Sequence, residues 1–337
     1  MRKALAKHLI WCLYGAFAVL AWIGLHFGPP GSMIGALLRA TPPIALWLPA
    51  APLLVISLFL RPWSRLAVGA VVSVGAWSLL LGFPAMGSGR GGTRGDLRVV
   101  TYNVMMSGNG EDQLSAQIAS LQPDILATQE TKCYRPHTNA RRAVERALPG
   151  YHIVQREDML IASRYPILRV EHIPFPGNNN FRFLIRAHID VKGQVVTVIN
   201  THNAPTLLEE YPSVMAKLKR MCEIDRVRSD QCARLAGMAA ETDGPVLVVG
   251  DFNHSPLGPA YGSLRTRLTD SFAAAGRGYG HTLTSDWPVK RVDYIFARNT
   301  TPVRSYVLRT PASDHLPLIA EFKLPAGPDS ALAAEAK

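Results

Sequence analysis

Acidic residues are absent from the first 95 positions of this 337-residue chain, although eight of its 36 lysines and arginines lie there. The remaining residues carry 28 basic and 25 acidic side chains, so most of the formal net charge of +11 belongs to the N-terminal part. The rest is nearly neutral and lacks the Lys/Arg stripe that tracking of a phosphate backbone requires. The pI of about 9.7 is therefore weak evidence for binding to DNA.

Cysteines are few, and their spacing excludes a zinc site of the usual Cys/His kind. The chain also has no glycine-rich phosphate loop of the Walker type. Two of the four cysteines, Cys222 and Cys232, are ten residues apart. They would form a disulfide if this part of the chain faces an oxidising compartment, or would otherwise be two free thiols, and both readings stay open.

Long uncharged runs are confined to residues 1–84, at 9–28, 44–60 and 66–83. The first is long enough to span a bilayer, and the other two are somewhat shorter. A cleaved signal peptide is the alternative for the first run, because Arg2, Lys3 and Lys7 precede it. Two further apolar runs close behind favour three transmembrane helices instead.

Basic residues in the short flanks predict the orientation of these helices. Five lie on the N-terminal side and three on the opposite side, which places the large C-terminal part outside the cytoplasm. We therefore expect a multi-pass membrane protein. Residues 85–95 are interpreted as a flexible linker, residues 96–324 as a separate folded domain, and residues 325–337 as a disordered tail.

Residues 96–324 alternate short apolar runs with two helical patterns. The helical patterns occupy 111–124 and 229–241. The predicted strands are 97–104, 124–130, 159–165, 181–190, 194–202, 245–252, 291–297 and 316–322. Helices that fall between β-rich stretches indicate an α/β fold in which two sheets pack together with helices outside them.

Six of these strands carry an acid, an amide or an imidazole at an end or edge. A single strand-end Asn or Asp is usually a turn former, but six such positions are harder to explain in that way. Oxygen ligands of this kind suit Mg²⁺ or Mn²⁺. The motifs concerned are "TYNV" with Asn103, "QET" at 129–131, "THN" at 201–203, "GDFNHSP" at 250–256, "RVDYIF" at 291–296 and "SDH" at 313–315.

In this order the motifs resemble those of the endonuclease/exonuclease/phosphatase superfamily, whose members include deoxyribonuclease I, abasic-site endonucleases, inositol polyphosphate 5-phosphatases and neutral sphingomyelinases. The resemblance covers roughly residues 97–323 and leaves the membrane segments outside. It implies a four-layered α/β sandwich of two packed mixed sheets with outer helices. It also implies divalent-metal-dependent hydrolysis of a phosphate ester.

The resemblance implies a role for each matching residue. Glu130 is similar to the main metal ligand, with Asn103 beside it and Asp314 completing or backing the metal site. Asp251 is similar to the acid that orients or deprotonates the attacking water, and Asn253 to the amide that holds a phosphate oxygen. For the two histidines, the resemblance implies that His315, oriented by Asp293, sits on the phosphate, and that His202 contacts the phosphate or assists the leaving group.

The sequence thus predicts a membrane-anchored, Mg²⁺- or Mn²⁺-dependent phosphodiesterase that activates a water molecule for attack. We expect it to be a multi-pass protein of a bacterial inner membrane, with residues 96–324 as an extracytoplasmic catalytic domain. Its substrate would be DNA or RNA, a phospholipid headgroup or a small phosphodiester, and the number of metal ions stays open. The alternative is a catalytically inactive relative that serves as a membrane-bound binding or scaffold module. The intact set of site residues speaks against that alternative, because a scaffold does not need them.

Overall fold

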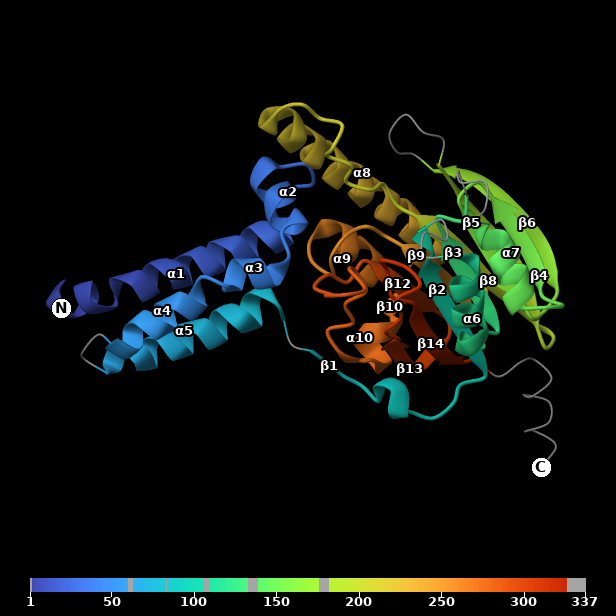
Figure 1. The fold of residues 1–337 in the computed structure, drawn as a ribbon, viewed down its shortest axis with the longest axis horizontal. Helices are drawn as coiled ribbons and strands as arrows, with labels where there is room; N and C mark the ends of the chain where they lie inside the picture. Colours follow the sequence, from blue (N-terminus) through green and yellow to red (C-terminus); the bar gives the residue numbers. More distant parts are fainter. Residues whose placement is uncertain are drawn as a thin grey trace. The chain divides into compact units, whose positions relative to one another are not determined.

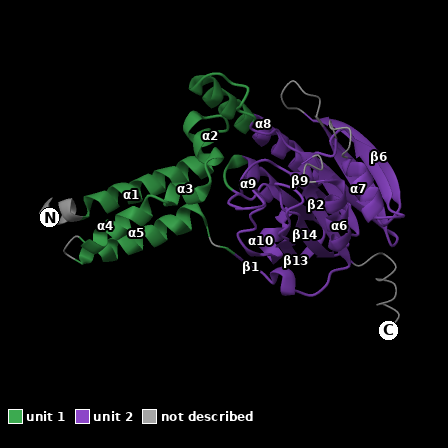
Figure 2. Ribbon diagram, in the orientation of Figure 1, with its two compact units in different colours: residues 1–84, 207–226, 257–259 green, residues 85–206, 227–256, 260–337 purple. Residues whose placement is uncertain are grey.

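The structure is a computed structural model that describes residues 2–59, 63–82, 84–105, 110–132, 139–175 and 182–325. It divides into two compact units, coloured separately in Figure 2. The N-terminal unit comprises residues 1–84, 207–226 and 257–259, and the sandwich unit comprises 85–206, 227–256 and 260–337. A segment from the middle of the chain therefore belongs to the same unit as the N-terminal helices.

The apolar runs of the N-terminal unit are rich in alanine and leucine, which favour helix formation. Its helices are α1 (Arg2–Phe27), α2 (Met33–Ala40), α3 (Pro43–Trp47), α4 (Ala50–Phe59) and α5 (Ser64–Leu80). By length and composition α1 can cross a membrane from His8 to Phe27. The bent combination of α2 with residues Pro43–Phe59 passes the same test only as a pair, and α5 is shorter. Three membrane spans therefore stay a prediction.

Two contacts show how this unit is held together. Trp11 is buried against α5, where a side chain at Gly69 would lie 2.5 Å from its ring, and its indole donates to Ser57 Oγ at 3.0 Å. The Arg39 guanidinium pairs with the Asp225 carboxylate through Nη2–Oδ2 at 2.6 Å and Nε–Oδ1 at 2.8 Å. Such a two-point, largely buried ion pair neutralises both charges and also fixes the orientation of the two side chains.

The sandwich unit contains two six-stranded sheets and a two-stranded ribbon of β1 (Ala85–Met86) and β11 (Arg277–Gly278). In one sheet the strand order is β13 (Thr301–Val307), β14 (Leu318–Lys323), β2 (Leu97–Asn103), β3 (Ile125–Gln129), β5 (Met159–Ser163) and β4 (His152–Arg156). The other has β10 (Thr269–Asp270), β12 (Asp293–Arg298), β9 (Val246–Asp251), β8 (Gln194–His202), β7 (Arg182–Val191) and β6 (Ile167–Phe175). The pairs β2–β3 and β8–β9 are parallel, and both sheets are mixed.

Alternation along each strand builds the four layers. In β2, Val99 packs into the core between the sheets, whereas Val100 packs against an outer helix. Helices α6 (Glu111–Leu121) and α7 (Ala140–Ala147) cover the outer face of the first sheet. The outer face of the second sheet is covered by the later part of α8 (Val214–Ala240) and by α9 (Pro259–Arg265), with α10 (Ser271–Ala275) beside β12 and β13 (Figure 1). The predicted fold class is confirmed.

The eight predicted strands are all present, but several elements were not predicted. Strand β6, with the sequence "ILRVEHIPF", is half-exposed and mixes charged with apolar residues, so it lacks a clear strand pattern. The expected linker 85–95 contains β1 and the 3₁₀ turn η1 (Gly89–Gly91), and Ser88 Oγ donates to Val303 O at 3.0 Å. Its flexibility stays a prediction. Of the expected tail 325–337, all residues after 325 lie outside the described part of the chain.

Candidate active site

Four predicted site residues lie on strands and share a strand face with the core between the sheets: Asn103, His202, Asp251 and Asp293. Side chains two positions apart point to the same side of a strand, so each polar strand end continues a row of core residues. The polar residues therefore form one end of the inter-sheet core. The rows are Val99–Thr101–Asn103, Ala127–Gln129, Val198–Asn200–His202, Leu247–Val249–Asp251 and Ile295–Asp293.

Strand register brings three of these residues side by side. His202 of β8 pairs with Asp251 of β9, and Asp251 pairs with Asp293 of β12. Neighbouring strands lie less than about 5 Å apart, so the three side chains converge. Gly250 makes this approach possible, because it has φ of +143° and a side chain there would lie 1.9 Å from Thr201 O.

The other sheet contributes Asn103 and Glu130. Glu130 follows β3 in the left-handed region with φ of +56°, an uncommon conformation for a glutamate. Asn103 Nδ2 donates to Glu130 Oε1 at 2.9 Å and to Asp251 Oδ2 at 3.1 Å. One amide therefore joins the acids of the two sheets.

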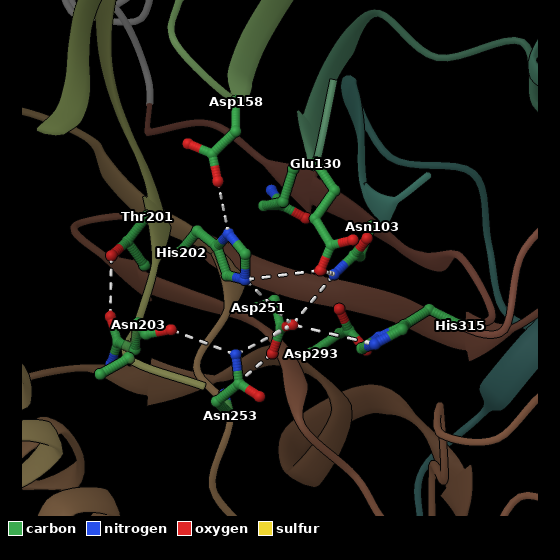
Figure 3. A network of polar contacts seen from close by, with 12 residues as sticks. Asn103, Glu130, Asp158, Thr201, His202, Asn203, Asp251, Asn253, Asp293 and His315 are labelled. Atoms are coloured by element: carbon green, nitrogen blue, oxygen red, sulfur yellow. Dashed lines mark hydrogen bonds and ion pairs between the residues drawn. The ribbon is translucent and has the colours of Figure 1, made fainter. Parts of the chain in front are cut away.

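Asp251 Oδ2 is the centre of the arrangement, as Figure 3 shows. Four nitrogen atoms from different strand ends surround it: Asn103 Nδ2 at 3.1 Å, Asn253 Nδ2 at 3.2 Å, His202 Nε2 at 3.7 Å and His315 Nε2 at 3.8 Å. Asn253 has φ of +55°, which an asparagine tolerates, and its backbone N–H donates to Asp251 Oδ1 at 2.8 Å. The Asp251 carboxylate is thus buried among donors.

His315 forms a buried pair with Asp293, in which Nδ1 lies 2.9 Å from Asp293 Oδ2. Burial alone would lower the pKa of His315, but the carboxylates of Asp293 and Asp251 raise it to about 10. Burial raises the pKa of Asp293, and its partner imidazole opposes that change. At neutral pH the His315 ring is therefore an imidazolium that can donate from Nε2.

His202 has a carboxylate partner that the sequence did not reveal. Its Nδ1 lies 2.8 Å from Asp158 Oδ2, and its Nε2 lies 3.8 Å from Glu130 Oε1 (Figure 3). Asp158 occupies the turn between β4 and β5, where no motif marks it. The site therefore contains two imidazole–carboxylate pairs, one on each side of Asp251.

Asp314 stands apart from the other predicted metal ligands. Its side chain is exposed, and within the described part of the chain its one side-chain hydrogen bond is with Ser313 Oγ at 3.2 Å. Ser313 Oγ in turn lies 2.8 Å from Asn103 O. Among the described residues, Asn103 is hydrogen-bonded to Glu130, whereas Asp314 is hydrogen-bonded to neither. Its role as a ligand stays a prediction.

The donor set fits a divalent cation. Glu130 Oε1 and Asp251 Oδ2 share one amide donor, and Asp251, Asp293 and His315 offer ligand atoms within 4.8 Å of one another. Asp293 Oδ1 is buried and has no hydrogen-bond partner among the described residues. Carboxylate oxygens gathered in this way suit Mg²⁺ or Mn²⁺. The Asn103 amide would have to turn over for its oxygen to join the ligands, because its nitrogen now faces the acids.

Two strand-end amides have a structural role instead. Asn200 accepts from Gln129 Nε2 at 2.7 Å and donates to Thr128 O and Leu160 O, both at 3.0 Å. These buried bonds join the two sheets immediately below the site.

His254 is not among the residues that meet in the site. It stacks on Tyr294, and burial lowers its pKa to about 4. The thiol of Cys232 lies 3.3 Å from its Nε2. Cys222 and Cys232 are both free cysteines, so the disulfide does not form in this structure.

Comparison with known proteins agrees with this geometry. The pattern of the Endonuclease/Exonuclease/phosphatase family matches residues 100–315. No curated protein matches the chain. An endonuclease/exonuclease/phosphatase from Beutenbergia cavernae is similar in structure, with a TM-score of 0.52, 20% identity and coverage of 69% of this chain and 72% of that one.

Two further solved structures are comparably similar. D. rerio TDP2 complexed with single-strand DNA product has a TM-score of 0.52 and 18% identity, covering 67% of this chain and 98% of that one. Mannosyl-6-phosphatase from Bacteroides thetaiotaomicron has a TM-score of 0.51 and 18% identity, covering 67% and 99%. At these identities the likenesses show a shared fold. Since the family pattern spans well over half of the sequence, the chain belongs to the endonuclease/exonuclease/phosphatase family.

Proposed function

We propose that the protein is a membrane-anchored hydrolase that cleaves a phosphodiester by attack of an activated water molecule, with Mg²⁺ or Mn²⁺ as cofactor. The observation that carries the proposal is the group of four nitrogens, two imidazole and two amide, around the buried Asp251 Oδ2. In the proposed reaction the four nitrogens bind the anionic phosphate, and the Asp251 carboxylate orients the attacking water beside it and accepts its proton.

Each residue has a step that its contacts support. Asp251 orients the water and takes its proton, and Asn253 holds a phosphate oxygen. The His315 imidazolium, fixed by Asp293, donates to a phosphate oxygen on which negative charge grows. His202, held through Nδ1 by Asp158, assists the leaving oxygen from Nε2.

A divalent cation would be held by Glu130 with Asn103, while Asp314 stays a candidate ligand. When bound, it would neutralise charge on the phosphate during attack. The predicted ligands and the Asp251–Asp293–His315 group are adjacent through the Asn103 bridge, so the number of ions is part of the test.

The membrane part of the proposal rests on α1, the helix that is long and apolar enough to cross a bilayer. An extracytoplasmic location of the sandwich unit, in a bacterial inner membrane, follows only from the basic flanks. The substrate within the phosphodiester class is DNA, RNA, a phospholipid headgroup or a small diester. Among solved structures of this fold, D. rerio TDP2 is complexed with a single-strand DNA product, and another protein is named a mannosyl-6-phosphatase. The fold therefore occurs both with nucleic acid and with sugar phosphate as the named compound.

The test uses the full-length protein purified in detergent, with millimolar Mg²⁺ or with EDTA. Candidate substrates are plasmid DNA, RNA, sphingomyelin, phosphoinositides and bis-p-nitrophenyl phosphate. We expect metal-dependent turnover that falls about 10²- to 10⁴-fold in Asp251→Asn, because a general base is lost. Asp243→Asn is the matched control, since Asp243 is exposed near the opposite end of β9. Equal turnover in the wild type and Asp251→Asn would refute the proposal.

A further inference from the structure

A cavity of roughly 470 Å³ lies in the sandwich unit outside the group of residues around Asp251. Its walls come from three distant parts of the chain: the turn η1, the segment that begins at β11, and the end of β13 with the residues that follow. Arg90, Arg277 and Arg309 contribute one arginine from each part, and among the described residues no aspartate or glutamate lines the cavity.

No carboxylate of the described residues pairs with the arginines that line this cavity. Among the described residues, Arg277 and Arg309 have neither an ion pair nor a side-chain hydrogen bond, and both are exposed. Arg90 lies over the ring of Tyr306 at 5.5 Å. Three like charges that line one cavity repel one another unless an anion joins them.

Nearby arginines behave differently, which makes the contrast informative. Arg98 and Arg304 also approach the Tyr306 ring, but both pair with the buried Glu321, at 3.2 and 3.3 Å. Glu321 therefore neutralises two arginines beside the cavity, whereas no carboxylate of the described residues pairs with Arg277 or Arg309.

The backbone holds the walls of the cavity in place. Met86 of β1 pairs with Arg277 of β11, and Gly89 then turns with φ of +55°, so close that a side chain there would lie 2.9 Å from Arg277 Cβ. On another wall, Leu316 directly follows His315, and its N–H donates to Thr282 O at 2.8 Å. The cavity is thus built partly from segments that also support the His315–Asp293 pair.

We propose that this cavity is a second phosphate-binding site, in which Arg90, Arg277 and Arg309 hold one phosphate group. That group belongs either to a part of the substrate remote from the cleaved ester or to free phosphate. The first source rests on the proposed phosphodiesterase activity, and the second does not. Guanidinium groups fit phosphate oxygens through paired N–H donors, which is the chemistry that the cavity offers.

Binding is tested by calorimetric titration of inorganic phosphate into the full-length protein in EDTA and low salt. We expect the double variant Arg277→Gln/Arg309→Gln to bind phosphate roughly a hundredfold more weakly, since each charge-assisted contact accounts for roughly tenfold. The control Arg265→Gln/Arg267→Gln removes the same charge from an exposed surface outside the cavity. If both double variants weaken binding equally, or if neither does, the proposal is wrong.

A second double variant, with lysine at both positions, separates loss of phosphate contacts from an effect on folding. Arg277→Lys/Arg309→Lys keeps both charges but not the paired donors, so its affinity should lie between those of the wild type and the glutamine variant. Circular dichroism identifies any variant that has not folded. An affinity of the lysine pair below that of the glutamine pair would contradict direct contact with phosphate.

Two substrates that differ by one phosphate identify the source of the group. These are thymidine 5′-(p-nitrophenyl phosphate) with and without a 3′-phosphate. If the substrate supplies the group, the 3′-phosphate raises kcat/KM roughly tenfold or more in the wild type, and the glutamine pair loses that gain. If phosphate binding is lost in the glutamine pair but the 3′-phosphate gives no gain, free phosphate is the ligand. If neither ester is cleaved although the binding difference remains, the cavity stands as a phosphate site without support from the proposed activity.

Discussion

The pair of His315 and Asp293 gives a prediction whose size follows from the structure. Asp293→Asn preserves the shape of the side chain but removes the negative charge that lies 2.9 Å from His315 Nδ1. The pKa of His315 should then fall from about 10 towards its ordinary 6.5, because burial opposes protonation and only the carboxylates of Asp251 and Asp314 still favour it. One pH unit above that ordinary value, about one tenth of the imidazole would remain protonated.

Two measurements follow the lost proton. In metal-free protein labelled at histidine Cε1, the His315 NMR signal should titrate near pH 10 in the wild type and near or below 6.5 in Asp293→Asn. With metal present, turnover of the variant should fall about tenfold by one pH unit above its new pKa, where the wild type is still active. Asp158→Asn is the control, because it removes the partner of His202 instead.

The same change has a consequence for stability whose sign is fixed. The folded protein binds the His315 proton more tightly than the unfolded chain does, so this contribution is complete below pH 6.5 and disappears as the pH rises to about 10. The unfolding free energy of Asp293→Asn should not show that decline. A His315 signal that titrates near pH 10 in both proteins, or near 6.5 in the wild type, would refute the reasoning.

Three further perturbations test other parts of the molecule. Asn200→Ala should lower the unfolding free energy by about 3 kcal/mol in chemical denaturation, because three buried groups lose their partner; an effect below about 1 kcal/mol would contradict this. Asp225→Asn should lower the thermal stability of the detergent-solubilised protein by about 3 kcal/mol, since Arg39 is left without its counter-charge; an unchanged melting temperature would count against it. Between pH 6.5 and about 4 the histidine is protonated in the unfolded chain but not in the folded protein, so the unfolding free energy of the wild type falls with pH in this range. In His254→Phe the unfolding free energy should fall less steeply. Parallel curves of unfolding free energy against pH would show that His254 is not responsible.

Most residues of the candidate site could be predicted from the sequence because they lie at strand ends. Strand ends of one sheet meet at a common edge. Asp251, His202 and Asp293 follow this rule, and register aligns them. The alternation of side chains along a strand is a further indication in the sequence. Asn103 and Asp251 each lie two positions beyond a residue that faces the space between the sheets, so they lie on the same inner face. The same alternation explains why Asn200, which is also near a strand end, points between the sheets.

The residues that escaped prediction depend on contacts without a local pattern. Asp158 lies in a short turn, and it meets His202 only because the two sheets pack together. The first half of α8 likewise joins the N-terminal unit through Asp225, a contact that spans 186 positions of sequence. Arg277 and Arg309 look like ordinary surface arginines until the fold places them in one cavity. Distant pairing of this kind is decided by topology rather than by composition.

The ion pair between Arg39 and Asp225 also sets an order of events during synthesis. Arg39 leaves the ribosome 186 residues before its partner. At about 5–20 residues per second, that delay is roughly ten to forty seconds. Helices α1 and α5 can pack together as soon as both exist, but the unit they belong to is completed only after strand β8 and the segment beyond it have been made. A pause or truncation before residue 225 would therefore leave the N-terminal helices packed together but without the ion pair between Arg39 and Asp225.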